Sequence, residues 1–162
     1  MAEYHFFTTW DVDAPIDAVW DVLSDATRYP TWWKYVISVT ELEPSQPDRK
    51  GGLFLYKWGT ALPYTLEFKM RVTEYEPPRL MEGHARGELD GVGRWELIEK
   101  EGFTRVTYDW RVRTTKAWMN LLAPLTKSAF SWNHDVIMTE GGRALARRLG
   151  VNLRGIKNET LK

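Results

Sequence analysis

The chain has no cysteine among its 162 residues and no net charge, because 22 lysines and arginines balance 22 aspartates and glutamates. Without cysteine, a disulfide-stapled fold, a thiol nucleophile, an iron–sulfur cluster and a cysteine-rich zinc site are excluded. The balanced charge disfavours nucleic acid as a partner, since non-specific binding needs excess positive charge to displace phosphate counterions. The interaction classes that remain depend mainly on shape and on apolar surface.

Long hydrophobic runs are also missing, so no stable membrane insertion is expected. The first residues have neither the basic start nor the apolar run of a secretory signal, which favours a cytoplasmic location. The three histidines, His5, His84 and His134, show no metal-ligand spacing with each other or with carboxylates. We therefore expect no metal and no other cofactor, and motifs for a serine nucleophile or a dinucleotide are absent too.

Aromatic side chains are what the chain has in excess: nine tryptophans, seven tyrosines and six phenylalanines, together 14% of the residues. Each can bury about 150–250 Å², and the polar N–H or O–H of tryptophan and tyrosine needs a partner when buried. Such a set either fills a packed core or lines a cavity that holds a small molecule. The composition leaves both interpretations open.

Alternation of apolar and polar residues predicts seven strands, most clearly at 64–72, where Phe68 and Met70 alternate with charged residues. Asp90-Gly91 predicts a turn between two of them. Two short helices are expected between the first and second strands. The predicted strands are 4–12, 36–42, 53–58, 64–72, 80–89, 93–99 and 103–114.

A helical period replaces the alternation from 116 to 149, with a disturbance expected at Pro124. On a helical wheel, one apolar stripe falls within about 40° of a line. It consists of Trp118, Leu122, Leu125, Ala129, Trp132 and Val136. The sequence thus predicts an α+β fold, a curved antiparallel sheet of about seven strands around a long C-terminal helix, in one domain at 1–149, with a polar tail at 150–162.

The segment WDVDAPIDAVWDVL at 10–23, followed by Asp25, Arg28-Tyr29-Pro30 and Trp32-Trp33, resembles the SRPBCC superfamily. This superfamily contains the START lipid-transfer domains, the birch-pollen allergen type proteins and the polyketide cyclase/dehydrase family. The resemblance covers residues 3–149 and implies the helix-grip fold, in which a hydrophobic cavity lies between the sheet and the helix. It does not establish cyclase chemistry, because one fold supports many functions.

Inward-facing residues of the predicted strands and helix are the candidate ligand-binding residues, unless all of them form packed core. From the sheet they are Tyr56, Trp58, Phe68, Met70, Trp95, Tyr108 and Trp110; from the helix they are Leu122, Ala129, Asn133, Val136 and Glu140. Asn133 and Glu140 are polar residues within the stripe, so they either bond neighbouring groups or meet the polar end of a ligand. His134 and Asp135 are expected to face solvent.

The strand at 80–89 has two possible registers, because Glu82, His84 and Arg86 alternate with Met81, Gly83 and Ala85. One register places small and apolar residues toward the cavity and leaves the charges in solvent. The other supplies an acid, a base and an anion anchor to the cavity, since a slip of one residue exchanges the two faces.

The predicted function is the non-catalytic binding, by a carrier or sensor, of a small hydrophobic molecule such as a lipid, isoprenoid or polycyclic aromatic. The alternative is a cyclase or dehydratase acting on a polyketide-like substrate in the same cavity. That enzyme would need a titratable group beside the substrate, and Glu140, His84 and Glu82 are the candidates. A third class, a module that binds a protein partner through exposed aromatics such as Trp32, fits less well, and no catalytic residue is assigned.

Overall fold

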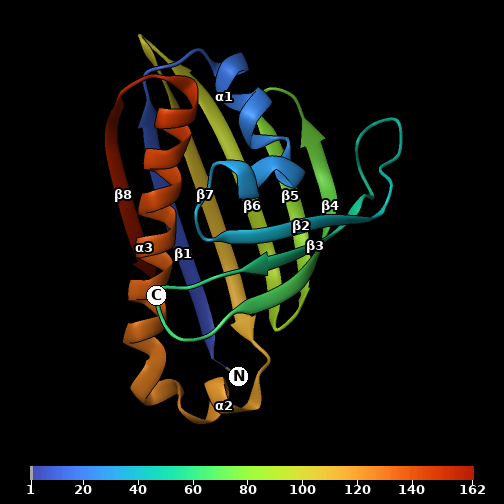
Figure 1. Ribbon diagram of the computed structural model, residues 1–162, viewed down its shortest axis with the longest axis vertical. Coiled ribbons are helices and arrows are strands. Elements are labelled where there is room, and N and C mark those ends of the chain that lie inside the picture. Colours follow the sequence, from blue (N-terminus) through green and yellow to red (C-terminus); the bar gives the residue numbers. More distant parts are fainter. Residues whose placement is uncertain (1) are drawn as a thin grey trace.

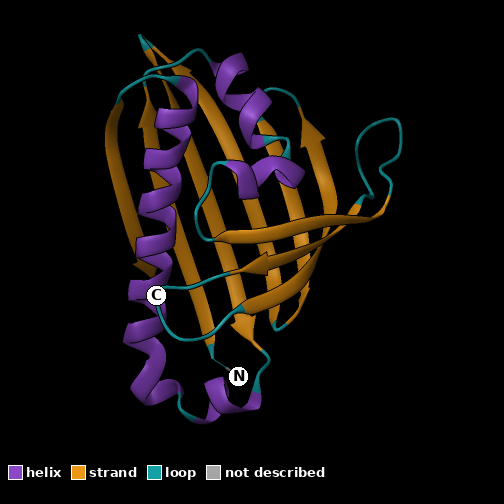
Figure 2. Cartoon of the chain, in the orientation of Figure 1, coloured by secondary structure: helices purple, strands orange, loops and turns teal. Residues whose placement is uncertain are grey.

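The computed structural model describes residues 2–162 and shows an eight-stranded antiparallel sheet curved around a long C-terminal helix (Figures 1 and 2). The strands are β1 Glu3–Val12, β2 Val36–Glu43, β3 Leu53–Trp58, β4 Leu66–Glu76, β5 Leu80–Gly87, β6 Leu89–Lys100, β7 Phe103–Thr114 and β8 Leu153–Leu161. The helices are α1 Ile16–Leu23, the 3₁₀ helix η1 Ala26–Thr31, α2 Ala117–Leu121 and α3 Ala123–Leu149. Across the sheet the strand order is β2-β3-β4-β5-β6-β7-β1-β8.

The predicted α+β helix-grip fold is confirmed, including the two short helices after β1 and the interruption of the long helix. Pro124 lies in the first turn of α3, where the missing N–H would have no partner within the helix. The helical segment therefore divides at Leu122 into the short α2 and the 27-residue α3.

The polar tail predicted at 150–162 is wrong, since most of it forms β8, which pairs with β1 from His5 to Val12. Without β8, that edge of β1 would leave backbone N–H and C=O groups unpaired. β8 supplies their partners and makes the eighth strand of the sheet. The sequence expectation missed it because this segment is short, polar and interrupted by Gly155.

The turn predicted at Asp90-Gly91 is also wrong, because both residues lie inside β6, opposite Arg113 and Val112 of β7. The chain instead turns between β5 and β6 at Gly87, whose φ of 133° suits glycine. A β-carbon at Gly91 would overlap the backbone carbonyl of Arg111. This glycine thus permits close strand approach rather than a turn.

The apolar stripe predicted along the helix does not face the sheet. Leu125 is 82% exposed and Trp132 is 54% exposed, and Trp118 and Leu122 are exposed as well. A helical wheel shows which residues share a face but not which face meets the sheet, and the close contacts of Gly141 with Trp33 and of Gly142 with Trp10 turn another face of α3 inward. The buried positions of α3 include Phe130, Asn133, Ile137, Met138, Gly141 and Leu145.

Two hydrophobic clusters form the core. The first centres on Trp10, Trp33 and Leu145, where α1, η1 and the second half of α3 meet. The second includes Phe6 and Trp110 of the sheet together with Phe130 of α3. Some of the aromatic side chains therefore form packed core, and others surround the space between the two clusters.

Candidate ligand-binding cavity

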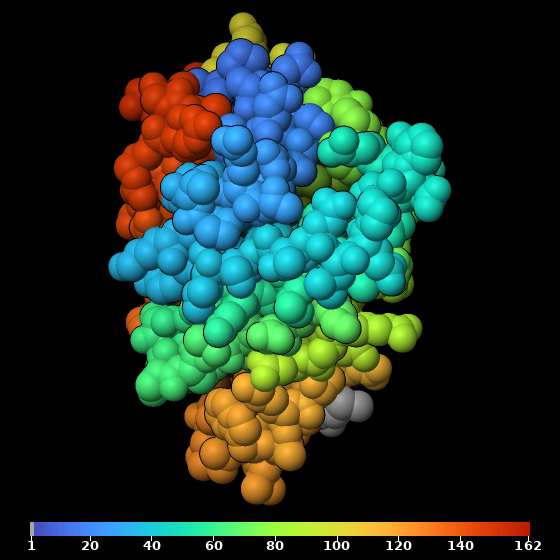
Figure 3. Space-filling model, turned by 45° about the vertical axis from the view of Figure 1, so that its right-hand side comes forward, coloured from blue at the N-terminus to red at the C-terminus, as the bar shows by residue number. Residues whose placement is uncertain are grey.

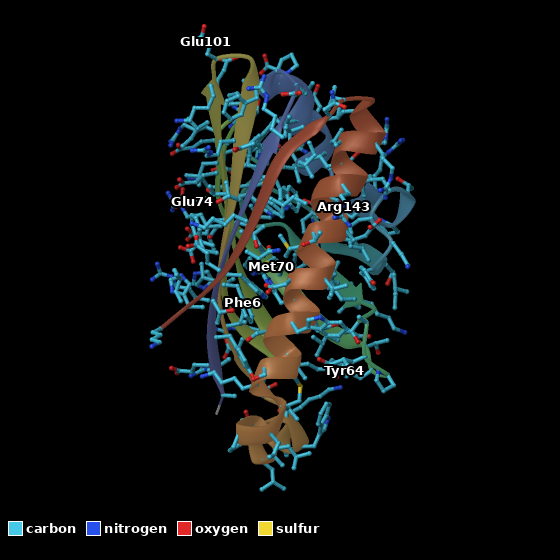
Figure 4. The ribbon with its side chains drawn as sticks, turned by 90° about the vertical axis from the view of Figure 1, so that its left-hand side faces the viewer. Phe6, Tyr64, Met70, Glu74, Glu101 and Arg143 are labelled. Atoms are coloured by element: carbon cyan, nitrogen blue, oxygen red, sulfur yellow. The ribbon has the colours of Figure 1, made fainter. Side chains whose placement is uncertain are left out.

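A cavity of about 680 Å³ lies between the inner face of the sheet and α3. This volume falls within the range of roughly 300–1,000 Å³ that is usual for small-molecule sites. Its inner wall consists largely of aromatic and aliphatic side chains from β3, β4, β6, β7 and α3. Figure 4 shows Met70 of β4 in the space between the sheet and the helix.

Eight of the twelve predicted ligand-binding residues line this cavity. They are Tyr56, Trp58, Phe68, Met70, Trp95, Tyr108, Trp110 and Asn133. The structure thus brings together the whole sheet-derived set and one residue of the helical set. Their contact with a ligand stays a prediction.

The other four predicted residues, Leu122, Ala129, Val136 and Glu140, do not line the cavity. Leu122 is exposed at the junction of α2 and α3, and Glu140 forms an ion pair of 2.7 Å with Arg147. Their placement follows from the rotation of α3, which turns Asn133 and Ile137 inward instead. The pairing with Arg147 also explains how Glu140 is accommodated without a ligand.

The register of β5 places its apolar and small residues inward. Gly83 and Ala85 are buried while His84 and Arg86 are exposed, and Met81 lines the cavity. Glu82 touches the cavity, but its carboxylate pairs with Arg94 at 2.8 Å. Of the two registers that the sequence left open, the structure has the one that keeps His84 and Arg86 out of the site.

The aromatic rings in the wall lie in stacked pairs. The rings of Trp95 and Tyr108 are 4.2 Å apart and those of Tyr108 and Trp110 are 5.8 Å apart, measured between centroids. Tyr56 and Phe68 form a third pair at 5.7 Å with nearly parallel planes. Their packing fixes the ring orientations and presents flat apolar surface to the cavity.

Two phenol hydroxyls inside the cavity have no hydrogen-bond partner within residues 2–162. Tyr56 and Tyr108 both line the cavity and keep part of their surface accessible, although both lie deep in the protein. Burial raises the pKa of each phenol well above its ordinary value. Both hydroxyls are therefore protonated at neutral pH and can donate hydrogen bonds.

A third phenol, Tyr29, differs because its hydroxyl donates to the backbone carbonyl of Leu23. It also lines the cavity, and burial raises its pKa well above the ordinary value. Its donor is thus already used by the protein, whereas those of Tyr56 and Tyr108 are available.

Only the oxygen of the Asn133 side-chain amide has a hydrogen-bond partner among the described residues. Its Oδ1 accepts a hydrogen bond of 2.7 Å from the backbone N–H of Ala61, in the connection between β3 and β4. The amide NH₂ group has no protein acceptor among the described residues. Asn133 therefore holds a loop with one end of its amide and retains two donors at the other.

His134 is a cavity residue that the sequence reasoning placed in solvent. Its ring stacks on Phe6 at 4.0 Å between centroids, and its Nδ1 is buried without a partner within the described chain. Burial lowers the pKa of His134, and Asp135, 3.9 Å from Nδ1, opposes this shift only partly. Phe130, His134 and Ile137 share one face of α3 by their helical spacing, but this face is less apolar than the stripe from which the cavity-facing side was predicted.

The cavity reaches the surface between residues 24–27 and the β2–β3 loop, where exposed polar residues such as Asp25 and Arg49 border it. Figure 3 shows these two segments, blue and cyan, on the same face of the molecule. Within residues 2–162, no three histidine or carboxylate side chains are grouped to hold a metal ion. Over the same residues, no helix is both long and apolar enough to cross a bilayer.

A family model described as polyketide cyclase / dehydrase and lipid transport matches residues 4–150. The chain belongs to this family. The resemblance to the START-like SRPBCC superfamily is thereby confirmed. No curated protein sequence matches significantly.

Solved structures of several relatives share the fold at low sequence identity. The protein TTHA0849 from Thermus thermophilus has a TM-score of 0.71 at 14% identity, with 89% of this chain and 98% of that chain covered. A START superfamily protein from Mycobacterium smegmatis has a TM-score of 0.68 at 14% identity, with 91% of this chain and 97% of that chain covered. The Zhui aromatase/cyclase from Streptomyces sp. R1128 has a TM-score of 0.64 at 16% identity, with 92% of this chain and 94% of that chain covered. At such identities these likenesses show the fold alone.

Proposed function

We propose that the protein is a carrier or sensor that binds a small hydrophobic molecule, a lipid, isoprenoid or polycyclic aromatic, in the cavity between the sheet and α3. The observation that carries this proposal is the pair of partnerless phenol donors, Tyr56 and Tyr108, inside an aromatic cavity of about 680 Å³. A tyrosine that only filled core would be expected to pair its hydroxyl within the protein, as Tyr29 does with the carbonyl of Leu23. A cytoplasmic location and the absence of a nucleic-acid partner stay predictions from the sequence.

The apolar walls provide the binding free energy. Burying about 300 Å² of apolar ligand surface gives roughly 7 kcal/mol before the cost of ordering, at about 25 cal/mol per Å². This approaches the value of about 8 kcal/mol that a micromolar dissociation constant requires. Hydrogen bonds from the phenols or from the Asn133 amide to a carbonyl or hydroxyl oxygen would fix the orientation of the ligand.

Tyr→Phe variants of Tyr29, Tyr56 and Tyr108 allow a test with its own control, because each variant removes one hydroxyl and keeps the ring. Tyr108→Phe and Tyr56→Phe should weaken the binding of 1,8-dihydroxyanthraquinone about tenfold, while the free energy of unfolding stays within about 0.5 kcal/mol. Tyr29→Phe is the control: it should lower the unfolding free energy by about 1 kcal/mol and leave affinity unchanged. Calorimetric titration and urea unfolding on the same samples measure both quantities.

The proposal fails if Tyr56→Phe and Tyr108→Phe behave as Tyr29→Phe does, with a loss of stability and no loss of affinity. Native mass spectrometry of freshly purified protein is the complementary experiment. A retained apolar ligand would appear as added mass and would identify the chemical class directly.

A cyclase or dehydratase function is the second candidate, and His134 is the observation that favours it. The three titratable candidates from the sequence lie elsewhere: His84 is exposed, while Glu82 and Glu140 pair with arginines. His134 lines the cavity, and its lowered pKa keeps it neutral at pH 7, as a general base requires. It could remove a proton from a carbon between two carbonyls of a polyketide-like chain. Turnover of such a chain that His134→Gln abolishes without loss of binding would establish this function.

A further inference from the structure

Exposed apolar side chains are concentrated on α2 and the first half of α3. Leu121 and Leu125 are 81% and 82% exposed, and Trp118, Leu122 and Trp132 are about half exposed. We call these five residues the apolar tip. Nine large hydrophobic side chains are exposed among the described residues, and five of the nine lie between 118 and 132. Isolated exposed leucines need no explanation, but a contiguous group marks an interaction site.

Four of the five residues of the apolar tip belong to α2 and the start of α3, which lie at one end of the elongated molecule. Figure 1 shows α2 beyond the ends of the central strands, and the same segment projects as a knob at the bottom of Figure 3. In Figure 4 it is at the opposite end from Glu101 in the β6–β7 hairpin. A convex projection of this kind can insert into a lipid layer, which needs no complementary pocket in a partner.

Within the segment that carries the apolar tip, the charged side chains have one sign. Residues 116–134 contain Lys116 and Lys127 and no aspartate or glutamate, although acidic residues are as numerous as basic ones in the whole chain. Lys127 is exposed and has no carboxylate partner within residues 2–162; its ammonium lies 5.7 Å from the Tyr4 ring centroid. Lys116 pairs with Glu88 at 2.9 Å. Exposed leucines and tryptophans in one segment that also carries lysine and no carboxylate are typical of a segment that lies in a lipid interface.

We propose that the apolar tip docks the protein reversibly on the surface of a bilayer that contains anionic lipids. Leu121 and Leu125 would enter the headgroup–acyl boundary, Trp118 and Trp132 would lie at headgroup level, and Lys127 would attract anionic headgroups. Such docking is peripheral and needs no spanning helix. A second copy of the chain is the less favoured occupant, because a stable interface buries about 800 Å² per partner and fits complementary surfaces, which a convex knob does not supply to itself.

The same two helices connect the apolar tip to the interior. Met119 of α2 and Phe130 of α3 point the other way and pack in the cluster that includes Leu66 and Phe68, two residues of the cavity wall. A docked bilayer would therefore lie one helix away from the cavity. The docking proposal does not depend on the identity of the ligand or on whether the cavity is occupied.

Vesicle flotation tests the proposal with the full chain, using phosphatidylcholine vesicles with and without about one third phosphatidylglycerol. We expect binding to the anionic vesicles and a blue shift of tryptophan emission. The double variant Leu121→Glu/Leu125→Glu should bind at least tenfold more weakly. The matched control Leu42→Glu/Ile98→Glu also replaces two exposed aliphatic residues with glutamate, but away from the tip, and should keep most of the binding. Circular dichroism of both variants confirms that they are folded.

Three outcomes would overturn the proposal. The first is no flotation of the wild type with anionic vesicles. The second is an equal loss of flotation in the tip variant and the control variant, which would reflect added negative charge alone. The third is a concentration-dependent dimer in analytical ultracentrifugation that dissociates in the tip variant without any vesicle binding, which would assign the apolar tip to a second copy.

Discussion

The two halves of α3 meet different surroundings. In the second half, the buried residues include Gly141, Gly142 and Ala144, which bring the helix close to Trp10 and Trp33. In the first half, Phe130 is buried, while Leu125 and Trp132 extend into solvent. Asn133 and His134 lie at the boundary and line the cavity.

This contrast shows that residue size and contact, rather than apolar character, anchor the helix. Small residues in the second half leave room for two tryptophan rings, and Trp33 Nε1 also donates to the carbonyl of Ile137 at 3.1 Å. Leu125 and Trp132 of the first half are exposed instead, although they are larger and more apolar. One helix thus combines a fixed half that sets its rotation with a half whose apolar surface is available to other molecules.

A pair of tryptophan substitutions should show the contrast most strongly. Trp33→Ala should lower the free energy of unfolding by about 3–5 kcal/mol, because a buried ring and its hydrogen bond are lost. Trp132→Ala, on the exposed half, should change it by less than about 0.5 kcal/mol. Urea unfolding measures both, and similar losses in the two variants would contradict the account.

Gly141→Ala should lower the unfolding free energy by about 1–3 kcal/mol, because the added β-carbon would overlap the Trp33 ring. The helix propensity of alanine opposes this effect by about 1 kcal/mol. Ser128→Ala, on the exposed half, has only the propensity effect and should be neutral or slightly stabilising. If Gly141→Ala is the more stable of the two variants, the close contact with Trp33 does not restrict the size of the residue at position 141.

Sequence patterns predicted the sheet and most of the sheet-derived cavity wall because strand alternation is local. Phe68, Lys69 and Met70 alternate directly, and β3 and β7 have the predicted bounds. The rotation of α3 could not be predicted in the same way. It depends on the contacts of Gly141 with Trp33 and of Gly142 with Trp10, which join residues more than a hundred positions apart. For this reason His134, which was expected to face solvent, lines the cavity, and Glu140 does not.

Asn133→Leu should lower the unfolding free energy by about 1 kcal/mol, since the N–H of Ala61 loses its acceptor. It should also weaken binding of 1,8-dihydroxyanthraquinone if the free NH₂ group meets the ligand. Asn133 serves both the fold and the site in this account. A loss of stability with unchanged affinity would restrict Asn133 to holding the β3–β4 connection.

His134 should make a pH-dependent contribution to stability. Its pKa is lowered in the folded protein by burial, so between that pKa and about pH 6.5 the unfolded chain binds a proton that the folded chain does not. Stability should therefore fall as the pH drops from about 6.5. The difference between the unfolding free energies of the wild type and His134→Gln should shrink over the same range. A difference that stays constant, or grows in acid, would mean that His134 is not buried in neutral form.

The central claim is that the space between the sheet and α3 binds a small hydrophobic molecule. Isothermal titration calorimetry at two temperatures tests it most directly, with protein extracted to remove any retained ligand and with oleic acid, farnesol and 1,8-dihydroxyanthraquinone as probes. The account predicts one-to-one binding of at least one probe with a dissociation constant near the micromolar range and a negative heat-capacity change, the signature of apolar burial. Absence of saturable heat for all three probes at both temperatures would contradict it.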